Sequence, residues 1–436
     1  MGTLKLFLRY IAIFIITAAV LISSLLLVSL IPREKIQKNM EKSAAYLQQK
    51  GAAFPFTVIG VGCSHADYYA DAVLLNVAFY FEREHPAESV SWAHFYSEDK
   101  YDWNGMVTDY LPFAVKNQPE PNQQYLRYWH GSLVIVRPLL IWLSISAIYK
   151  LLGGLLWILL GSIVILLIRK GFRKEAVAFI LAMIAVSVWF VPVCLEYTWM
   201  FLVMAITTLI VIRLSLKQEF DKMPGLFLCV GMITVFLDFF TTETITLLIP
   251  LLFMSAIRHK QNSDPPHWIS VVHCSALWGT GYIAMWMTKW IFATVVLKQD
   301  VMPFVRNSIT EHLGTDNRLS LVQLWCKSIR NNIHTLSTLN YGMIGAALTI
   351  LLFFCLIFLP VVLNKITLKK HIQKEWGMLY LLIGMIPYLR FIVLSGHSAV
   401  HSWFTYRAQV ASIMAFIFAF YELVDFNFKR KRIGEK

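Results

Sequence analysis

The sequence is a series of apolar runs separated by short polar or basic intervals. The first run, Phe7–Ile31, exceeds the roughly 20 apolar residues needed to cross a bilayer. Ten further apolar segments are Gly131–Tyr149, Leu151–Ile168, Ala176–Val193, Trp199–Ile212, Leu226–Asp238, Thr244–Ile257, Trp268–Leu297, Tyr341–Leu363, Trp376–Leu394 and Phe404–Val424. This pattern predicts an all-α polytopic membrane protein with about 10–12 transmembrane or re-entrant helices.

The runs divide the chain into four parts. We expect an N-terminal anchor at residues 1–31, an extracytoplasmic loop domain with amphipathic helices at 32–130, a transmembrane helical bundle at 131–426 and a basic tail at 427–436. Lys5 and Arg9 precede the first run and Lys429–Arg432 follow the last, so the positive-inside rule places both termini in the cytoplasm. The first run is longer than a secretory signal core, which favours an uncleaved anchor.

The number of segments conflicts with this topology, because two cytoplasmic termini require an even number of crossings. Counting back from the C-terminus, every basic interval falls on the cytoplasmic side until Arg169–Lys174. Either Gly131–Tyr149 or Leu151–Ile168 is re-entrant, or Arg169–Lys174 lies outside against the charge rule. The same count makes Leu226–Ile257 a hairpin of two short helices whose turn reaches the outer side.

Composition narrows the class of protein. The chain is 57% hydrophobic and 15% charged, with a mean hydropathy of +0.59, which excludes an ordinary soluble domain. The net charge of +13 is concentrated between apolar runs, where orientation signals lie, so we expect no nucleic-acid partner. The six cysteines are dispersed and have neither disulfide-framework nor metal-site spacing. The sequence also lacks phosphate-loop, dinucleotide, nucleophile-elbow and HExxH motifs.

Candidate chemistry begins in the polar interval after the first run, at CSHADYYADAVLLNVAFYFERE (Cys63–Glu84). Asp67 and Asp71 are four residues apart, so a helix would carry both carboxylates on one face. Such a pair can hold a divalent cation, or one member can act as general base for an acceptor hydroxyl. The alternative is that both residues cap or solvate the start of an interfacial helix.

Basic residues gather in two predicted outer segments, YLRYWHGSLVIVR and RFIVLSGHSAVHSWFTYR. They are Arg127, His130 and Arg137 in the first segment, and Arg390, His397, His401 and Arg407 in the second. Guanidinium groups match phosphate oxygens bidentately, so these groups predict a phosphate or pyrophosphate site. Snorkelling to the headgroups is an alternative for Arg137.

The turn DFFTTET carries Asp238 and Glu243 between the two short helices of the predicted hairpin. Irregular backbone at membrane depth is tolerated only where protein or water covers it. We therefore expect these acids to line a cavity, with a solvated turn as the alternative.

This layout resembles that of multi-spanning glycosyltransferases of the GT-C fold. The segments DYYADAVLLNVAFY, RYWHGSLVIVRPLL, LDFFTTETITLLIPLL and HSWFTYR are similar to segments of an uncharacterised bacterial group with that layout. The resemblance implies a GT-C-like outer domain, a bacterial cytoplasmic-membrane location and a polyprenyl-phosphate-linked sugar donor. It implies Asp71 as catalytic base, with Asp67 as its partner or a metal ligand, and it places Tyr406 at the cavity. Neither acid lies in a DxD or paired-acid motif, so the resemblance leaves dependence on a divalent metal open.

The sequence therefore predicts transfer of a sugar from a polyprenyl-phosphate donor to a glycan, lipid or protein acceptor of the cell envelope. A transporter or flippase of a lipid-linked or anionic substrate is the first alternative, because it would also explain charged residues within apolar segments. A membrane acyltransferase that uses His130 or His401 as base is the second.

Overall fold

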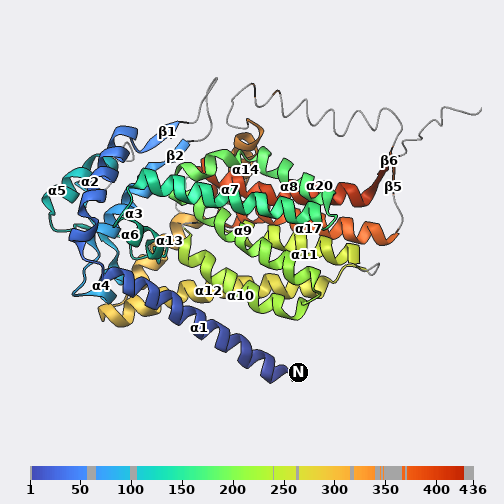
Figure 1. The fold of residues 1–436 in the computed structure, drawn as a ribbon, viewed down its shortest axis with the longest axis horizontal. Helices are drawn as coiled ribbons and strands as arrows, with labels where there is room; N and C mark the ends of the chain where they lie inside the picture. Colours follow the sequence, from blue (N-terminus) through green and yellow to red (C-terminus); the bar gives the residue numbers. More distant parts are fainter. Residues whose placement is uncertain are drawn as a thin grey trace, which may run out of the picture.

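The computed structural model describes residues 2–55, 65–98, 106–238, 240–261, 265–314, 319–338, 344, 347, 366–368 and 371–426. Most of the predicted segment Tyr341–Leu363 and the basic tail at 427–436 lie outside these described residues. Figure 1 shows an elongated bundle of helices with smaller elements gathered at one end.

The prediction of an all-α polytopic membrane protein is confirmed. Seven helical stretches of the described chain are long and apolar enough to cross a membrane. They contain α1 (Thr3–Ser29), α7 (Ile145–Arg169), α9 (Leu195–Leu216), α10 (Met223–Leu237), α12 (Trp268–Leu297), α17 (His371–Val393) and α20 (Gln409–Leu423). The described bundle also contains two shorter helices, α8 (Arg173–Ala185) and α11 (Ile245–Gln261).

The bundle has two chemically different ends. At one end, Lys260 at the end of α11 donates to the Gly171 carbonyl after α7, and His259 pairs with Glu422 of α20. We call this the basic end, because it carries Arg169–Lys174, Lys217–Lys222 and Arg258–Lys260. We call the opposite end the loop end, because the small elements between α1 and α7 gather there (Figure 1).

The path of the chain resolves the conflict over the number of crossings. The predicted segment Gly131–Tyr149 contains only the seven-residue helix α6 (Leu133–Leu139) and the start of α7, both at the loop end. The helix α7 then runs to the basic end, and α8 with the 3-10 helix η1 (Val188–Val193) returns to the start of α9. Gly131–Tyr149 is therefore no crossing, and Arg169–Lys174 lies at the same end as the start of α1.

The predicted hairpin Leu226–Ile257 is also present, as α10 and α11 joined by a turn at the loop end. Beyond α12, the loop end carries five short elements. They are α13 (Met302–Leu313), α14 (Leu321–Ser337), α18 (Ser395–Val400), α19 (Ser402–Thr405) and the 3-10 helix η4 (Tyr406–Ala408). At the basic end, β5 (Ile366–Leu368) pairs with β6 (Val424–Phe426), and the 3-10 helix η2 (Phe220–Lys222) precedes α10.

The predicted loop segment contributes helices α2 (Arg33–Lys50), α3 (Tyr68–Tyr80), α4 (Pro86–Trp92) and α5 (Met106–Asn117). Two small antiparallel pairs accompany them, β1 (Ala53–Pro55) with β2 (His65–Asp67) and β3 (His94–Phe95) with β4 (Gln123–Gln124). The helix α3 is buried on almost every side, as expected for a helix that is apolar all round. Its side chains belong to one hydrophobic core that extends through the bundle, so this segment packs as part of the bundle.

Two buried cations attach the loop segment to the bundle. Arg137 is fully buried and donates to the carbonyls of Ser29, Ile31 and Phe81 at 3.3, 2.9 and 2.9 Å. Lys289 of α12 donates to the carbonyls of Val90 and Ser91, at the end of α4. Helix C-termini leave carbonyl groups without intrahelical partners, and a cation satisfies them. Arg137 thus has a structural role here. Its guanidinium group is buried and is not available for the predicted contact with a phosphate.

Small residues bring α10 and α12 into close contact. A Cβ at Gly231 would clash with the Trp278 carbonyl, and one at Gly281 would clash with the Leu228 carbonyl. Small residues at helix interfaces allow backbones to approach, which favours packing inside membranes. A Cβ at Gly279, on the same helix α12, would meet no atom within 4 Å.

We predict that Gly281→Ala destabilises the protein, because the added methyl group must separate α10 from α12. Overpacking of this kind costs about 1–3 kcal/mol. Gly279→Ala is the matched control, since both changes add the same helix propensity but only one meets a neighbouring backbone. Thermal unfolding of the detergent-solubilised variants measures the difference, and equal melting temperatures would contradict the packing argument.

Candidate functional site

Side chains from several distant segments meet at the loop end, between the loop segment and the bundle. We call this group the polar cluster: His65, Asp67, Arg127, Glu196, His312, His397 and His401. Asp67, Arg127, His397 and His401 are each partly exposed, whereas Glu196 and His312 are buried. Four members of the cluster, Asp67, Arg127, His397 and His401, were predicted from the sequence. The sequence did not predict the other three, which are His65, Glu196 and His312.

The histidines form a connected row. The Tyr128 hydroxyl and His312 Nε2 are hydrogen-bonded at 3.1 Å, and the His312 ring stacks on His397 with centroids 5.2 Å apart. The His397 and His401 rings are 4.7 Å apart, and Trp403 lies 4.8 Å from both His401 and His65. Adjacent imidazoles in this row can each donate a ring N–H to the same bound group.

Two of these rings, His65 and His401, are held in their neutral form by their surroundings. Burial, followed by the nearby charges of His312 and Arg127, lowers the pKa of His401 to about 4. Burial and the charge of Arg407 lower the pKa of His65 to about 4. A neutral imidazole has one donor and one acceptor nitrogen, so these rings can donate one hydrogen bond without adding charge.

A pair of carboxyl groups lies beside the histidine row. Asp67 Oδ1 caps α3 by accepting the Ala70 N–H at 3.0 Å, and the carboxyl group also faces Trp403 and Glu196. Burial raises the pKa of Asp67. Glu196, in the first turn of α9, is 9% exposed, and its Oε2 has no hydrogen-bond partner among the described residues. Two neighbouring carboxyl groups in a buried site favour one shared proton over two charges.

Asp71 has a different environment from Asp67, although they lie on the same side of α3. Its carboxylate accepts the Tyr149 hydroxyl at 2.5 Å and the backbone N–H groups of Leu195 and Glu196 at 2.9 and 3.3 Å. The last two are orphan donors at the N-terminus of α9, which favours an anion. Asp71 is 1% exposed, and burial raises its pKa to about 7. Asp71 therefore caps a helix, as the alternative from the sequence allowed. The helix that it caps is α9, however, and not α3, in which Asp71 itself lies.

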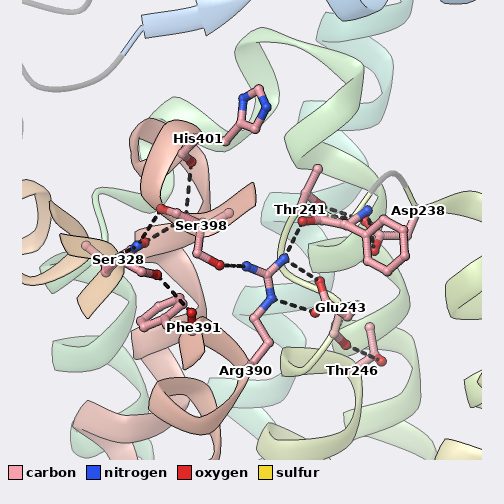
Figure 2. A network of polar contacts seen from close by, with 12 residues as sticks. Asp238, Thr241, Glu243, Thr246, Ser328, Arg390, Phe391, Ser398 and His401 are labelled. Carbon is pink, nitrogen blue, oxygen red and sulfur yellow. Dashed lines mark hydrogen bonds and ion pairs between the residues drawn. The ribbon is translucent and has the colours of Figure 1, made fainter. Parts of the chain in front are cut away.

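Arg390 is engaged inside the protein. Figure 2 shows its guanidinium between Glu243 and Ser398, with Nε and one terminal nitrogen on the two carboxylate oxygens at 2.7 and 3.2 Å. The remaining donors contact the Ser398 hydroxyl at 2.7 Å and the Phe240 carbonyl. Arg390 and Glu243 thus form a buried bidentate ion pair that joins α17 to the turn before α11, in place of the predicted phosphate and cavity-lining roles.

Asp238 organises the same turn. Its carboxylate accepts the N–H groups of Phe240 and Thr241 at 3.0 Å and the Thr241 hydroxyl at 2.7 Å (Figure 2). Burial, followed by the charge of Glu243, raises the pKa of Asp238. The short Asp side chain mimics a backbone turn, which explains an acid at this position. Asp238 is 5% exposed, and its carboxylate is bonded within the turn. It therefore does not have the predicted role of lining a cavity.

Three further predicted residues are buried. Arg407 lies over the rings of Tyr197 and Tyr406, 4.5 and 4.9 Å from their centroids, and the Tyr406 hydroxyl donates to the Val186 carbonyl. His130 is hydrogen-bonded to the Tyr125 carbonyl at 3.0 Å, and burial lowers its pKa to about 3. Arg407, Tyr406 and His130 are at most 1% exposed, whereas several members of the polar cluster are partly exposed.

The two predicted metal ligands both lie beside the start of α9: Asp71 accepts the backbone N–H groups of Leu195 and Glu196, whereas Asp67 faces the Glu196 side chain. Within the described part of the chain, no group of three or more His, Cys, Asp and Glu residues has the geometry to hold a metal ion.

We predict that Arg390→Met destabilises the protein strongly, because it leaves the Glu243 carboxylate buried without its partner. Breaking a buried ion pair from one side typically costs about 3–5 kcal/mol. Replacing both residues, Arg390→Met with Glu243→Met, should recover part of this loss. Arg306→Met, at an exposed position of α13, is the control for removing a cation. Chemical unfolding is measured for the unsubstituted protein, Arg390→Met, Glu243→Met, the double variant and Arg306→Met, and a loss in the double variant equal to the sum of the two single losses would contradict the pairing.

We also predict that Asp71 makes stability dependent on pH. An unfolded Asp titrates near pH 3.9 and the native Asp71 near pH 7, so between these values the native state holds more proton than the unfolded state. The contribution of Asp71 to the free energy of unfolding therefore falls as the pH rises from about 4 to 7.

Thermal unfolding at pH 5 and pH 7.5 measures this contribution. Asp71→Asn should show a flatter pH dependence than the unsubstituted protein, and Asp109→Asn, at an exposed position of α5, should keep the original slope. The same slope in all three proteins would show that Asp71 does not titrate in this range.

The sequence matches no known protein family, no curated protein and no solved structure.

Proposed function

We propose that the protein is a membrane glycosyltransferase that moves a sugar from a polyprenyl-phosphate donor to an acceptor hydroxyl. One observation carries the proposal. The partly exposed Asp67, with the buried Glu196 next to it, lies in the same cluster as Arg127, His397 and His401 at one end of a membrane bundle. Such a site offers a proton acceptor and an anion-binding surface within reach of a lipid-linked substrate.

Each part of the reaction has a candidate residue. The lipid tail stays in hydrocarbon along the bundle, and Arg127 with the His397–His401 pair binds the phosphate by charge and hydrogen bonds. The acceptor oxygen attacks the anomeric carbon and inverts it, while the bond from that carbon to the phosphate oxygen breaks. The phosphate leaves with the electron pair, and Asp67 takes the proton of the acceptor hydroxyl.

Asp67 is a better candidate for the base than Asp71. Asp67 is partly exposed, whereas Asp71 is buried and its oxygens are occupied by Tyr149 and the N-terminus of α9. Burial raises the pKa of Asp67, which makes its ionised form a stronger proton acceptor. Glu196 positions this carboxyl group and shares its proton, and Asp71 holds α3 against α9.

The remaining parts of the proposal follow from charge. The positive-inside rule places the basic end in the cytoplasm and the polar cluster at the outer face. A bacterial cytoplasmic membrane and a glycan, lipid or protein acceptor of the cell envelope fit this orientation. A divalent ion bound by Asp67 and Glu196 together with the donor phosphate would neutralise the leaving group.

We predict that Asp67→Asn lowers sugar transfer by roughly 100-fold or more, because an amide cannot accept the proton. Transfer from radiolabelled polyprenyl-phosphate sugars to the extracted lipid and glycan fractions is measured in membranes that contain equal amounts of each variant. Asp109→Asn, which removes an exposed carboxylate of the same loop segment, should keep full activity.

Two additional measurements separate the roles. Asp71→Asn should reduce thermal stability more than turnover per folded molecule, whereas Asp67→Asn should do the reverse. Chelator addition identifies a metal requirement through loss of transfer that Mg²⁺ or Mn²⁺ restores. Normal transfer by Asp67→Asn would remove Asp67 as the base. Uptake or flipping of the labelled donor without sugar transfer would favour a transporter.

A further inference from the structure

The helix α14 has an unusual distribution of side chains. The side chains that it buries against the protein are mostly polar: Ser328, Asn332 and Thr335. Those that it exposes include Leu321, Val322, Trp325 and Ile333, which are 54, 62, 37 and 45% exposed. A helix on a water-facing surface buries its apolar side, so this inverted arrangement indicates an apolar environment outside α14.

The polar side of α14 is fixed to the bundle by hydrogen bonds. Ser328 donates to the Phe391 carbonyl at the end of α17, and Asn332 donates to the Ser398 carbonyl of α18. Thr405 donates to the Asn332 side chain at 2.6 Å. These bonds set the rotation of α14, so its apolar side is held outward.

At 100° per residue, the exposed surface of α14 contains two adjacent stripes. Val322, Trp325, Ile329 and Ile333 form an apolar stripe, and Lys327, Arg330 and His334 form a basic stripe beside it. Adjacent apolar and basic stripes are typical of helices that lie in the membrane interface, with cations at the anionic headgroups.

The apolar stripe also continues a surface that faces lipid. The spanning helix α17 exposes Met378, Leu382, Met385, Leu389 and Val393 along one side, with 47–60% exposure. This row ends at the loop end, where Ser328 joins α14 to α17. Apolar side chains therefore extend from the side of the bundle to α14 at the end of the membrane-spanning region.

We propose that α14 is an interfacial helix that binds the bilayer surface, with its apolar stripe among the acyl chains and its basic stripe on anionic lipid headgroups. This inference does not depend on the proposed enzymatic function. With α14 in the membrane interface, Ser398 and the neighbouring His397 lie at the depth of the lipid headgroups, and α14 lies between Ser398 and the lipid.

Spin labels on adjacent residues test the orientation in the full chain. Labels at Ile333→Cys and His334→Cys are compared in lipid nanodiscs, in a parent with Cys63, Cys326 and Cys355 replaced by Ser. These changes remove the exposed thiol of α14 and the two thiols outside the described residues. Ile158→Cys on α7, 67% exposed on a spanning helix, is the hydrocarbon reference, and Asn117→Cys at the exposed end of α5 is the aqueous reference. Collision rates with oxygen and with a water-soluble nickel chelate report the depth of each label.

We expect the label at residue 333 to resemble the hydrocarbon reference and the label at residue 334 to resemble the aqueous one. Adding phosphatidylglycerol to phosphatidylcholine should lower nickel access at residue 333 by roughly twofold. Lys327→Gln with Arg330→Gln should abolish that lipid dependence. Equal nickel access at both positions would overturn the proposal. A label at residue 333 that neither reagent reaches would also overturn it, because such a label would be covered by a protein partner. Retention of the lipid dependence in the double variant would remove the headgroup contact.

Discussion

The structure depends on satisfying helix ends that are buried at the loop end. A helix terminus leaves up to four backbone groups without partners, and each is expensive to bury where water is absent. In this protein charged side chains from other elements supply the missing partners. Arg137 binds carbonyls after α1 and α3, Lys289 binds carbonyls of α4, and Asp71 binds the first N–H groups of α9. The loop segment and the bundle are joined through these contacts as well as through their common apolar core.

This requirement determines which charged residues remain for chemistry. Arg137, Arg390 and Asp71 complete buried polar networks, and removing any of them leaves unpaired groups inside the protein. Arg127, Asp67 and His401 are partly exposed and lie where the supporting elements meet. Structural and functional charges therefore occur side by side in the same short segments, and their exposure and partners distinguish them.

The sequence was sufficient to predict the elements that depend on local pattern. Length and apolar periodicity predicted the spanning helices and the hairpin of α10 and α11. They did not distinguish a crossing from the short helix α6, because an apolar run of this length fits either a span or a segment buried in protein. The proline within α6 and the polar Ser144 before α7 were the available signals for an interruption.

The candidate site was predictable in its location but not in its members. Asp67 and Asp71 were expected to act together because four-residue spacing brings side chains to one side of a helix. Asp67 instead caps the first turn of α3 and faces the Glu196 side chain, while Asp71 accepts the backbone N–H groups at the start of α9. Glu196 lies 129 residues from Asp67 in the sequence, and His312 lies 85 residues from His397. Their place beside Asp67 and His397 depends on tertiary packing that no local spacing encodes.

The same packing suggests why the polar cluster lies at the loop end. Ionisable groups inside the membrane are costly, whereas helix ends near its surface offer backbone dipoles, water and neighbouring charges. At the loop end, the N-terminus of α9 carries Glu196 and the interrupted helix after α17 carries His397 and His401. The breaks that end the spanning helices thus create the irregular backbone on which an accessible polar site can form. The inverted helix α14 covers that backbone on one side by bonding it with Asn332 while presenting apolar side chains outward.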